Sequence, residues 1–156
     1  MIFMMIIFNA LALTEQEKRQ CVVDCAIDQL GKDYVYGDEG PDTFDCSGLV
    51  FYCYEQCDPT VFNGVRATTS SISQMGEKLQ SKDDLLLADV VFTSPGHVGI
   101  YIGKSGENYQ MIHAPQTGDV VKISNIFSWE MGIRLIPNSS LKCLELFILF
   151  MIFILF

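Results

Sequence analysis

Short runs of alternating apolar and polar residues fill the second half of the chain, and this period of two is typical of β-strands. Residues 97–103 show it most clearly, because three branched aliphatic side chains share one face there. A polar turn with a glycine follows this run and favours a hairpin. The pattern predicts five strands, near residues 88–93, 97–103, 109–114, 120–124 and 132–136.

The first half of the chain follows helical spacing instead. Thr14 and Glu17 are spaced as a capping box, which predicts a helix over residues 14–30. Residues 46–57 place apolar side chains near helical spacing and predict a second helix. A short third helix is expected near residues 71–79. Helices followed by an antiparallel sheet indicate an α+β fold.

The N-terminal end of the chain is strongly apolar. Residues 1–12 are typical of the apolar region of a secretory signal peptide, and residues 10–12 (Ala-Leu-Ala) match its cleavage site. This predicts a mature start at Leu13. An N-terminal core segment or a membrane anchor are the alternatives, although spanning a bilayer takes about 20 residues.

The C-terminal end is a tail of unknown role, residues 138–156, and its last part is uniformly apolar. From residue 146 it would reach only about 16 Å as a helix, whereas a bilayer core is roughly 30 Å thick. The tail could insert partly and make weak membrane contact. It could also be a removed lipid-anchor signal or a spurious extension of the reading frame.

Length and charge narrow the class of protein. The 156 residues fit one domain, which we expect over residues 13–137. Asp and Glu outnumber Lys and Arg by 19 to 10, giving a net charge of -9. This excess argues against nucleic acid and anionic surfaces as partners, because both require basic patches. We expect a monomer.

Six cysteines are present, and two pairs of them are each spaced one helical turn apart. No histidine is spare and the spacing is not that of a short zinc knuckle, so we expect no metal. The two pairs could face each other across packed helices and form one or two disulfides in an exported chain. Alternatively, they are small buried core residues. These pairs are Cys21 with Cys25 and Cys53 with Cys57.

Cys46 stands in the first turn of the second predicted helix, directly after Asp45, a good N-cap. The positive end of the helix dipole favours an anion there, which makes the thiolate available. Ser47 and Gly48 are small, so another group can approach the sulfur closely. The ordinary alternative is a buried structural cysteine.

The only two histidines, His97 and His113, fall on two neighbouring predicted strands. An antiparallel pair of strands could place them side by side. Gly99, on the same face as His97, would leave room for the helix that carries Cys46. A thiolate, a base and a group that orients the base are what a thiol hydrolase needs.

These motifs resemble the NlpC/P60 family of cysteine peptidases over roughly residues 15–137. The resemblance implies a papain-like α+β fold, with N-terminal helices packed on a five- to six-stranded antiparallel sheet. Two departures are a longer loop over residues 66–74 and Ala88 in place of the family's glycine. The matching segments are residues 34–37 (Tyr-Val-Tyr-Gly), 45–50, 88–92, 97–103 and 113–114.

The resemblance also implies a role for each residue of the site. Cys46 would be the nucleophile, His97 the general base and acid, and His113 the residue that orients His97. The Tyr34 hydroxyl and the backbone N–H of Cys46 would stabilise the oxyanion. No metal and no cofactor are implied.

A stretch of acidic residues precedes Cys46, and the ordinary interpretation is a solvated loop with one helix cap. A sharper hypothesis is that some of these residues bind a cationic part of the substrate, such as a free amine. Asp45 and Ser47 are further candidates for substrate binding because they flank the thiol. The acidic stretch contains Asp33, Asp38, Glu39, Asp42 and Asp45.

The family's usual substrate is the peptidoglycan stem peptide, cut between the side-chain carboxyl of D-glutamate and a diamino acid. This implies a secreted or cell-surface peptidase acting on peptidoglycan or muropeptides. Two other classes stay open. One is a lipid- or acyl-directed thiol hydrolase or acyltransferase of the same superfamily, and the other is an inactive secreted binding module.

Overall fold

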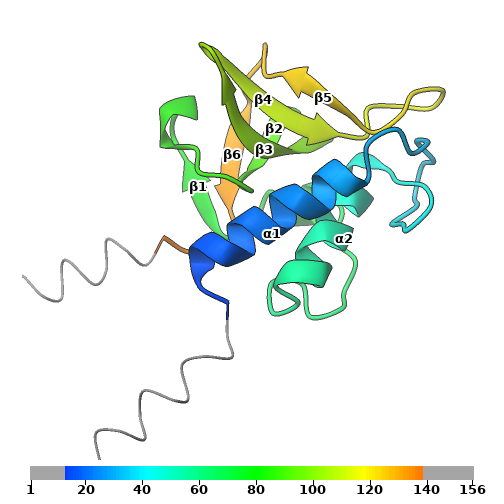
Figure 1. The fold of residues 1–156 in the computed structure, drawn as a ribbon, viewed down its shortest axis with the longest axis horizontal. Helices are drawn as coiled ribbons and strands as arrows, with labels where there is room; N and C mark the ends of the chain where they lie inside the picture. Colours follow the sequence, from blue (N-terminus) through cyan, green and yellow to red (C-terminus); the bar gives the residue numbers. More distant parts are fainter. Residues whose placement is uncertain (1–12, 139–156) are drawn as a thin grey trace, which may run out of the picture.

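The computed structural model describes residues 13–138, and in it two helices lie side by side against a curved antiparallel sheet (Figure 1). The helices are α1 (Glu15–Asp28), α2 (Cys46–Cys57) and the short α3 (Thr69–Ile72), with a 3-10 turn, η2 (Lys82–Asp84), further on. The strands are β1 (Glu77–Leu79), β2 (Val90–Ser94), β3 (His97–Ser105), β4 (Asn108–His113), β5 (Lys122–Asn125) and β6 (Met131–Arg134). Their spatial order is β1-β6-β2-β3-β4-β5. The predicted α+β fold is confirmed.

Both long helices begin at the residues that the sequence predicts. Thr14 and Glu17 form the reciprocal capping box at the start of α1. The Asp45 carboxylate accepts a 2.6 Å hydrogen bond from the Gly48 N–H and caps α2. These caps satisfy backbone donors that a helix start leaves unpaired. Cys46 is consequently the first residue of α2.

The prediction of a third helix near residues 71–79 is wrong over most of that range. Only Thr69–Ile72 is helical, and Glu77–Leu79 forms β1, antiparallel to β6. Gly76 separates the two with φ of 58°, a left-handed conformation that favours glycine. A Cβ at Gly76 would lie 2.2 Å from the Arg134 carbonyl oxygen. Close contact with β6 therefore replaces the expected helical turns.

The two faces of the sheet carry separate apolar clusters. Val98 and Ile100 belong to the main core together with the buried faces of α1 and α2. Tyr101 and Met111 belong to a smaller cluster that also includes Val91. The alternation predicted for residues 97–103 therefore directs successive side chains into two different buried clusters. The helices pack on the face that carries Val98 and Ile100.

Gly99 does not make room for the helix that carries Cys46, contrary to the expectation from sequence. A Cβ at Gly99 would lie 2.8 Å from the Met111 Sδ and 3.1 Å from the His113 Cβ. The space beside Gly99 is therefore filled by side chains of β4. Because His113 is one of them, the glycine lets the neighbouring histidine strand approach β3 closely.

A disulfide joins Cys21 of α1 to Cys57 of α2, with 5.7 Å between their Cα atoms. One cysteine of each pair thus forms an inter-helix disulfide, which is one of the two arrangements that the sequence left open. Cys25 and Cys53 are free thiols. Cys143, the N-terminal segment 1–12 and the tail from residue 139 lie outside the described residues. Within residues 13–138, no helix is long and apolar enough to cross a bilayer.

A buried carboxylate ties the helices to the sheet. Asp89 is fully buried and pairs with Arg19 of α1 at 3.0 Å and with Arg134 of β6 at 2.9 Å. One residue earlier, the Ala88 carbonyl accepts a 2.6 Å hydrogen bond from the Tyr54 hydroxyl of α2. The short segment that leads into β2 thus contacts both long helices and β6.

Ala88 adopts φ of 69°, in the left-handed region that is unfavourable for residues with a Cβ. Such a conformation costs on the order of 1–3 kcal/mol and persists only where the surroundings impose it. The hydrogen bond to Tyr54 and the ion pairs of Asp89 supply that constraint. This conformation explains why a glycine suits the position in the family pattern.

Replacing Asp89 with Asn should destabilise the fold by about 3–5 kcal/mol, because it removes the buried carboxylate that pairs with Arg19 and leaves Arg134 with only the exposed Glu77. The free energy of unfolding in urea measures this. Glu77→Gln is the matched control, since it removes the exposed partner of Arg134, 3.4 Å away, and should change stability by under about 0.5 kcal/mol. Equal effects of the two substitutions would contradict the prediction.

Candidate active site

Cys46 is buried at the N-terminal end of α2, at the point where three segments meet. Its Sγ lies 3.9 Å from the Thr69 Oγ1 and 3.9 Å from the Gly96 carbonyl oxygen. Gly96 directly precedes His97, the first residue of β3. The thiol therefore sits between the start of α3 and the turn that leads into the histidine strand.

The carboxylate of Asp45 organises the loop around the thiol. Besides capping α2, it accepts hydrogen bonds from the Ser47 hydroxyl at 3.0 Å and the Gly37 N–H at 2.9 Å. Arg66 pairs with it at 2.7 Å. Asp45 thus connects the helix start with two loops, and its charge is neutralised by an arginine.

His97 and His113 lie side by side on β3 and β4, as the antiparallel pairing of these strands predicts. The His97 Nε2 and the His113 Nδ1 are 2.7 Å apart. On its far side, the His113 Nε2 lies 2.8 Å from the Ser124 Oγ of β5. Three adjacent strands thus each contribute one member of a hydrogen-bonded chain.

Burial keeps both imidazoles neutral near pH 7. It lowers the pKa of His97 below its ordinary value. Burial, reinforced by the neighbouring His97, lowers the pKa of His113 to about 4. In a neutral ring one nitrogen donates and the other accepts, so each bond in the chain sets the tautomer of the next ring. If His97 donates from Nε2, its Nδ1 is free to accept a proton.

Tyr34 shares a pocket with Cys46. Partial burial raises the pKa of the Tyr34 hydroxyl, and the negative charges of Cys46 and Asp45 add to this. The phenol therefore stays protonated and can donate a hydrogen bond. The pocket has a volume of about 340 Å³. The residues that line it are Tyr34, Tyr36, Gly37, Asp45, Cys46, Ser47, Arg66, Thr68, Thr69, Ser70 and Gly96.

The rest of the acidic stretch lies outside this pocket lining, and two of its members have partners of their own. Glu39 pairs with Arg66 at 3.0 Å, and the Asp38 carboxylate accepts a hydrogen bond from Thr43. Apart from Asp45, no member of the acidic stretch lines the pocket: Asp33, Asp38, Glu39 and Asp42 are all absent from its lining. Within the described residues, no cluster of three His, Cys, Asp or Glu side chains is arranged to hold a metal ion.

Three residues of this arrangement were not singled out from the sequence as site residues. Arg66 and Thr69 lie in the loop where the family pattern has a shorter Arg-Thr-Ser stretch, and that stretch was the available signal. Ser124 gave no signal, because it is one serine in a short predicted strand. Only its place beside His113 in the sheet reveals it.

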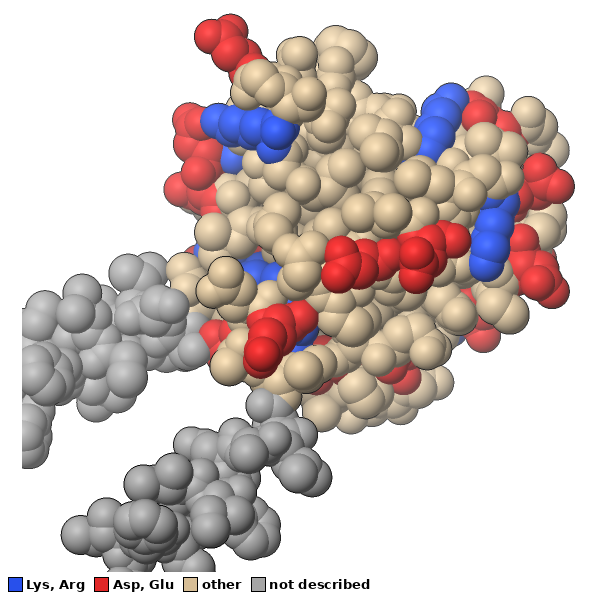
Figure 2. All heavy atoms as spheres, in the orientation of Figure 1, with Lys and Arg blue, Asp and Glu red and all other residues tan. Residues whose placement is uncertain are grey.

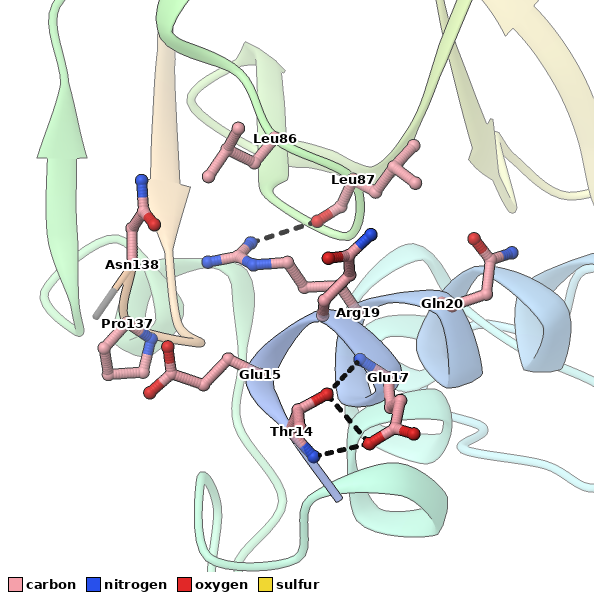
Figure 3. Close-up of a pocket in the computed structure, with 10 residues that line it drawn as sticks. Thr14, Glu15, Glu17, Arg19, Gln20, Leu86, Leu87, Pro137 and Asn138 are labelled. Carbon is pink, nitrogen blue, oxygen red and sulfur yellow. Dashed lines mark hydrogen bonds between the residues drawn. The ribbon is translucent and has the colours of Figure 1, made fainter. Parts of the chain in front are cut away.

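A second hollow, of about 690 Å³, lies at the N-terminal end of α1 (Figure 3). Figure 3 shows Arg19 reaching across it to the Leu87 carbonyl, at 3.0 Å, with the Thr14–Glu17 capping box at its edge. It contains no cysteine, histidine or other predicted site residue. Figure 2 shows that Lys and Arg side chains on the face in view are separated and form no continuous basic patch.

The sequence resembles known proteins along this same region. The NlpC/P60 family model matches residues 31–136. Probable endopeptidase p60 of Listeria seeligeri is 39% identical over 97 residues, which are 62% of this chain and 17% of that protein. Probable endopeptidase YafL of Escherichia coli strain K12 is 33% identical over 105 residues, 63% of this chain and 40% of that protein. The chain thus spans less than half the length of these two relatives.

Solved structures agree with this relationship. The NlpC/p60 domain of the peptidoglycan hydrolase SagA matches with a TM-score of 0.62 at 31% identity, covering 74% of this chain and 97% of that one. NlpC2 from Trichomonas vaginalis matches with a TM-score of 0.65 at 26% identity, covering 81% and 51%. With the family model matching more than half of its length, this chain belongs to the NlpC/P60 family.

Proposed function

We propose that this protein is a cysteine endopeptidase that hydrolyses peptidoglycan stem peptides at the D-γ-glutamyl–diamino acid bond. The observation that carries the proposal is a cysteine at a helix N-terminus, beside the start of a strand whose first residue opens a His–His–Ser chain. The p60 and SagA relatives, named as a probable endopeptidase and a peptidoglycan hydrolase, support the reaction and substrate class.

In the proposed mechanism the Cys46 thiolate attacks the amide carbonyl carbon, and the carbonyl π electrons move to oxygen. His97 holds the thiol's proton and delivers it to the leaving amine as the C–N bond breaks, which leaves a thioacyl enzyme. Water then loses a proton to His97 and attacks the thioester, releasing the acid and the thiol. His113 keeps the His97 ring oriented throughout.

The oxyanion of each tetrahedral intermediate needs donors close to Cys46. The backbone N–H of Cys46 is available because the first amides of a helix have no intrahelical partner. The Tyr34 hydroxyl, in the same pocket, is the second proposed donor.

Substrate contacts are proposed for the residues around the pocket. Asp45 and Ser47 flank the nucleophile, while Asp38, Glu39 and Asp42 would attract an amine on the stem peptide. Glu39 shares Arg66 with Asp45, so a substrate amine would compete with this guanidinium for the carboxylates. Specificity in this region therefore depends on the Arg66 ion pairs.

We further propose that residues 13–137 form the catalytic domain of a secreted or cell-surface monomer. A disulfide such as Cys21–Cys57 is typical of oxidising compartments and supports export. The signal peptide over residues 1–12 and the membrane contact of the tail remain predictions. A lipid- or acyl-directed enzyme is less well supported, because the named relatives are endopeptidases and a peptidoglycan hydrolase.

Cys46→Ala should abolish cleavage of defined tetrapeptide muropeptides, because the variant lacks the attacking sulfur. Mass spectrometry should show loss of the two terminal residues with the wild type and not with Cys46→Ala. Cys53→Ala is the matched control, since it removes a buried free thiol on the same helix and should leave the products unchanged. Cleavage at another bond that still depends on Cys46 would refute the proposed bond and keep the mechanism.

Absence of any product, with a thiol that still reacts with iodoacetamide, would refute the peptidase proposal. Transfer or hydrolysis of an acyl ester by the same preparation would then identify a lipid- or acyl-directed enzyme. Binding of muropeptides without turnover would identify a binding module.

The acid limb of the pH profile of kcat/KM should lie below pH 6.5. Burial lowers the pKa of His97, so the ring stays neutral and able to accept a proton to a lower pH than a free imidazole does. Activity should fall only as the pH drops through the lowered pKa of His97. An acid limb at or above pH 6.5 would contradict this assignment of the base.

Ser124→Ala should lower kcat/KM roughly tenfold, because the His113 Nε2 loses the partner that sets its tautomer. Ser124→Thr keeps the hydroxyl and should restore activity. Nitrogen chemical shifts of the two rings should show an altered His113 tautomer in the alanine variant only. Wild-type activity with an unchanged tautomer would show that Ser124 does not position His113.

A further inference from the structure

Four cysteines lie between α1 and α2 as two pairs, one helical turn apart. The first pair is the disulfide between Cys21 and Cys57. Cys25 lies one turn further along α1, and Cys53 lies one turn back along α2. Four residues advance a helix by about 6 Å. Because α1 and α2 run antiparallel at this disulfide (Figure 1), these two steps lead to the same level, and the Cys25 and Cys53 side chains interact there.

The two thiols differ in access to solvent. Cys53 is fully buried in the main core, whereas Cys25 is half-buried and packs against that core. A hydrogen bond with Cys53 lowers the pKa of Cys25, whereas burial raises the pKa of Cys53. Asp28 and Lys32 are the charged side chains whose fields reach the pair. A partly exposed thiol with a lowered pKa beside a buried resolving thiol is the usual arrangement of a reactive dithiol.

We propose that Cys25 and Cys53 are a second, redox-active site that reacts with disulfide donors and closes a second bond between the helices. The donor class is a small-molecule or protein disulfide, such as oxidised glutathione. The site is independent of the proposed peptidase chemistry.

The reaction balances as two thiol–disulfide exchanges. The Cys25 thiolate attacks one sulfur of the donor, forms a mixed disulfide and releases one donor thiolate. Cys53 then loses its proton and attacks the Cys25 sulfur, releasing the second donor thiolate. Overall the donor disulfide is reduced to two thiols, and the dithiol is oxidised to a Cys25–Cys53 disulfide.

Cys46 is excluded from this exchange by its place on α2. It precedes Cys53 by seven residues, about 10 Å along the helix axis, and lies at the opposite end from Cys57. Oxidation of Cys25 and Cys53 to a disulfide therefore leaves the Cys46 nucleophile free. The direct effect of the new disulfide is to link the middle of α2, the helix that begins with Cys46, to α1.

The test uses the full chain equilibrated in glutathione buffers of increasing oxidised fraction, then unfolded in guanidinium chloride, alkylated with iodoacetamide and digested with trypsin. No Lys or Arg lies between Lys32 and Arg66, so trypsin leaves the fragments 20–32 and 33–66 joined by the Cys21–Cys57 bond. These fragments hold three free cysteines under reducing conditions that spare that bond. Oxidation should remove two of the three alkylation sites, those of Cys25 and Cys53.

Two variants separate the possible results. Cys53→Ala should accumulate the glutathione adduct on Cys25, because the resolving thiol is missing. Cys25→Ser should keep Cys53 alkylatable only after unfolding and form no adduct. Continued alkylation of both thiols in fully oxidised buffer, with the Cys21–Cys57 bond intact, would overturn the proposal. A new bond to Cys46 would overturn it as well.

Discussion

The buried carboxylate of Asp89 is the interaction on which the arrangement of this domain depends. It pairs with an arginine from the first helix and another from the last strand, at a position with no solvent exposure. Burying charged groups costs several kcal/mol each, and the attraction offsets that cost only when every partner is in place. The pairing therefore selects one way of stacking the helices on the sheet.

That stacking aligns the two halves of the candidate site. Tyr54 of α2 is hydrogen-bonded to Ala88, one residue before Asp89, and β2 pairs with β3 directly afterwards. The helix that begins at Cys46 and the strand that begins at His97 are thus both anchored to the same short segment. The left-handed Ala88 shows that the backbone there is held against its own preference.

The disulfide and the proposed nucleophile lie at opposite ends of α2. The Cys21–Cys57 disulfide secures the C-terminal end of α2, while Asp45 and its ion pair with Arg66 secure the N-terminal end. A nucleophile on a helix fixed at both ends keeps its position relative to the sheet, which is what a preorganised site requires. The His–His–Ser chain is rigid for the same reason, since each member stands on a paired strand.

Features set by neighbouring residues could be predicted from the sequence. Both helix starts follow from caps that act over three residues, and the hairpin that pairs the two histidines follows from period-two alternation around a polar turn. The family motifs placed Cys46, Tyr34 and the histidines on these elements. Local hydrogen bonding and side-chain periodicity are enough for this, because they involve only residues close in the chain.

The tertiary structure alone decided the partners that are distant in the chain. Residues 77–79 became a strand because β6, more than fifty residues later, offers them an edge. Ser124 meets His113, Arg66 meets Asp45, and β4 rather than α2 fills the space at Gly99, all through the packing of separate elements. Such contacts depend on strand order and on buried charge pairing, and neither leaves a periodic signal in the sequence.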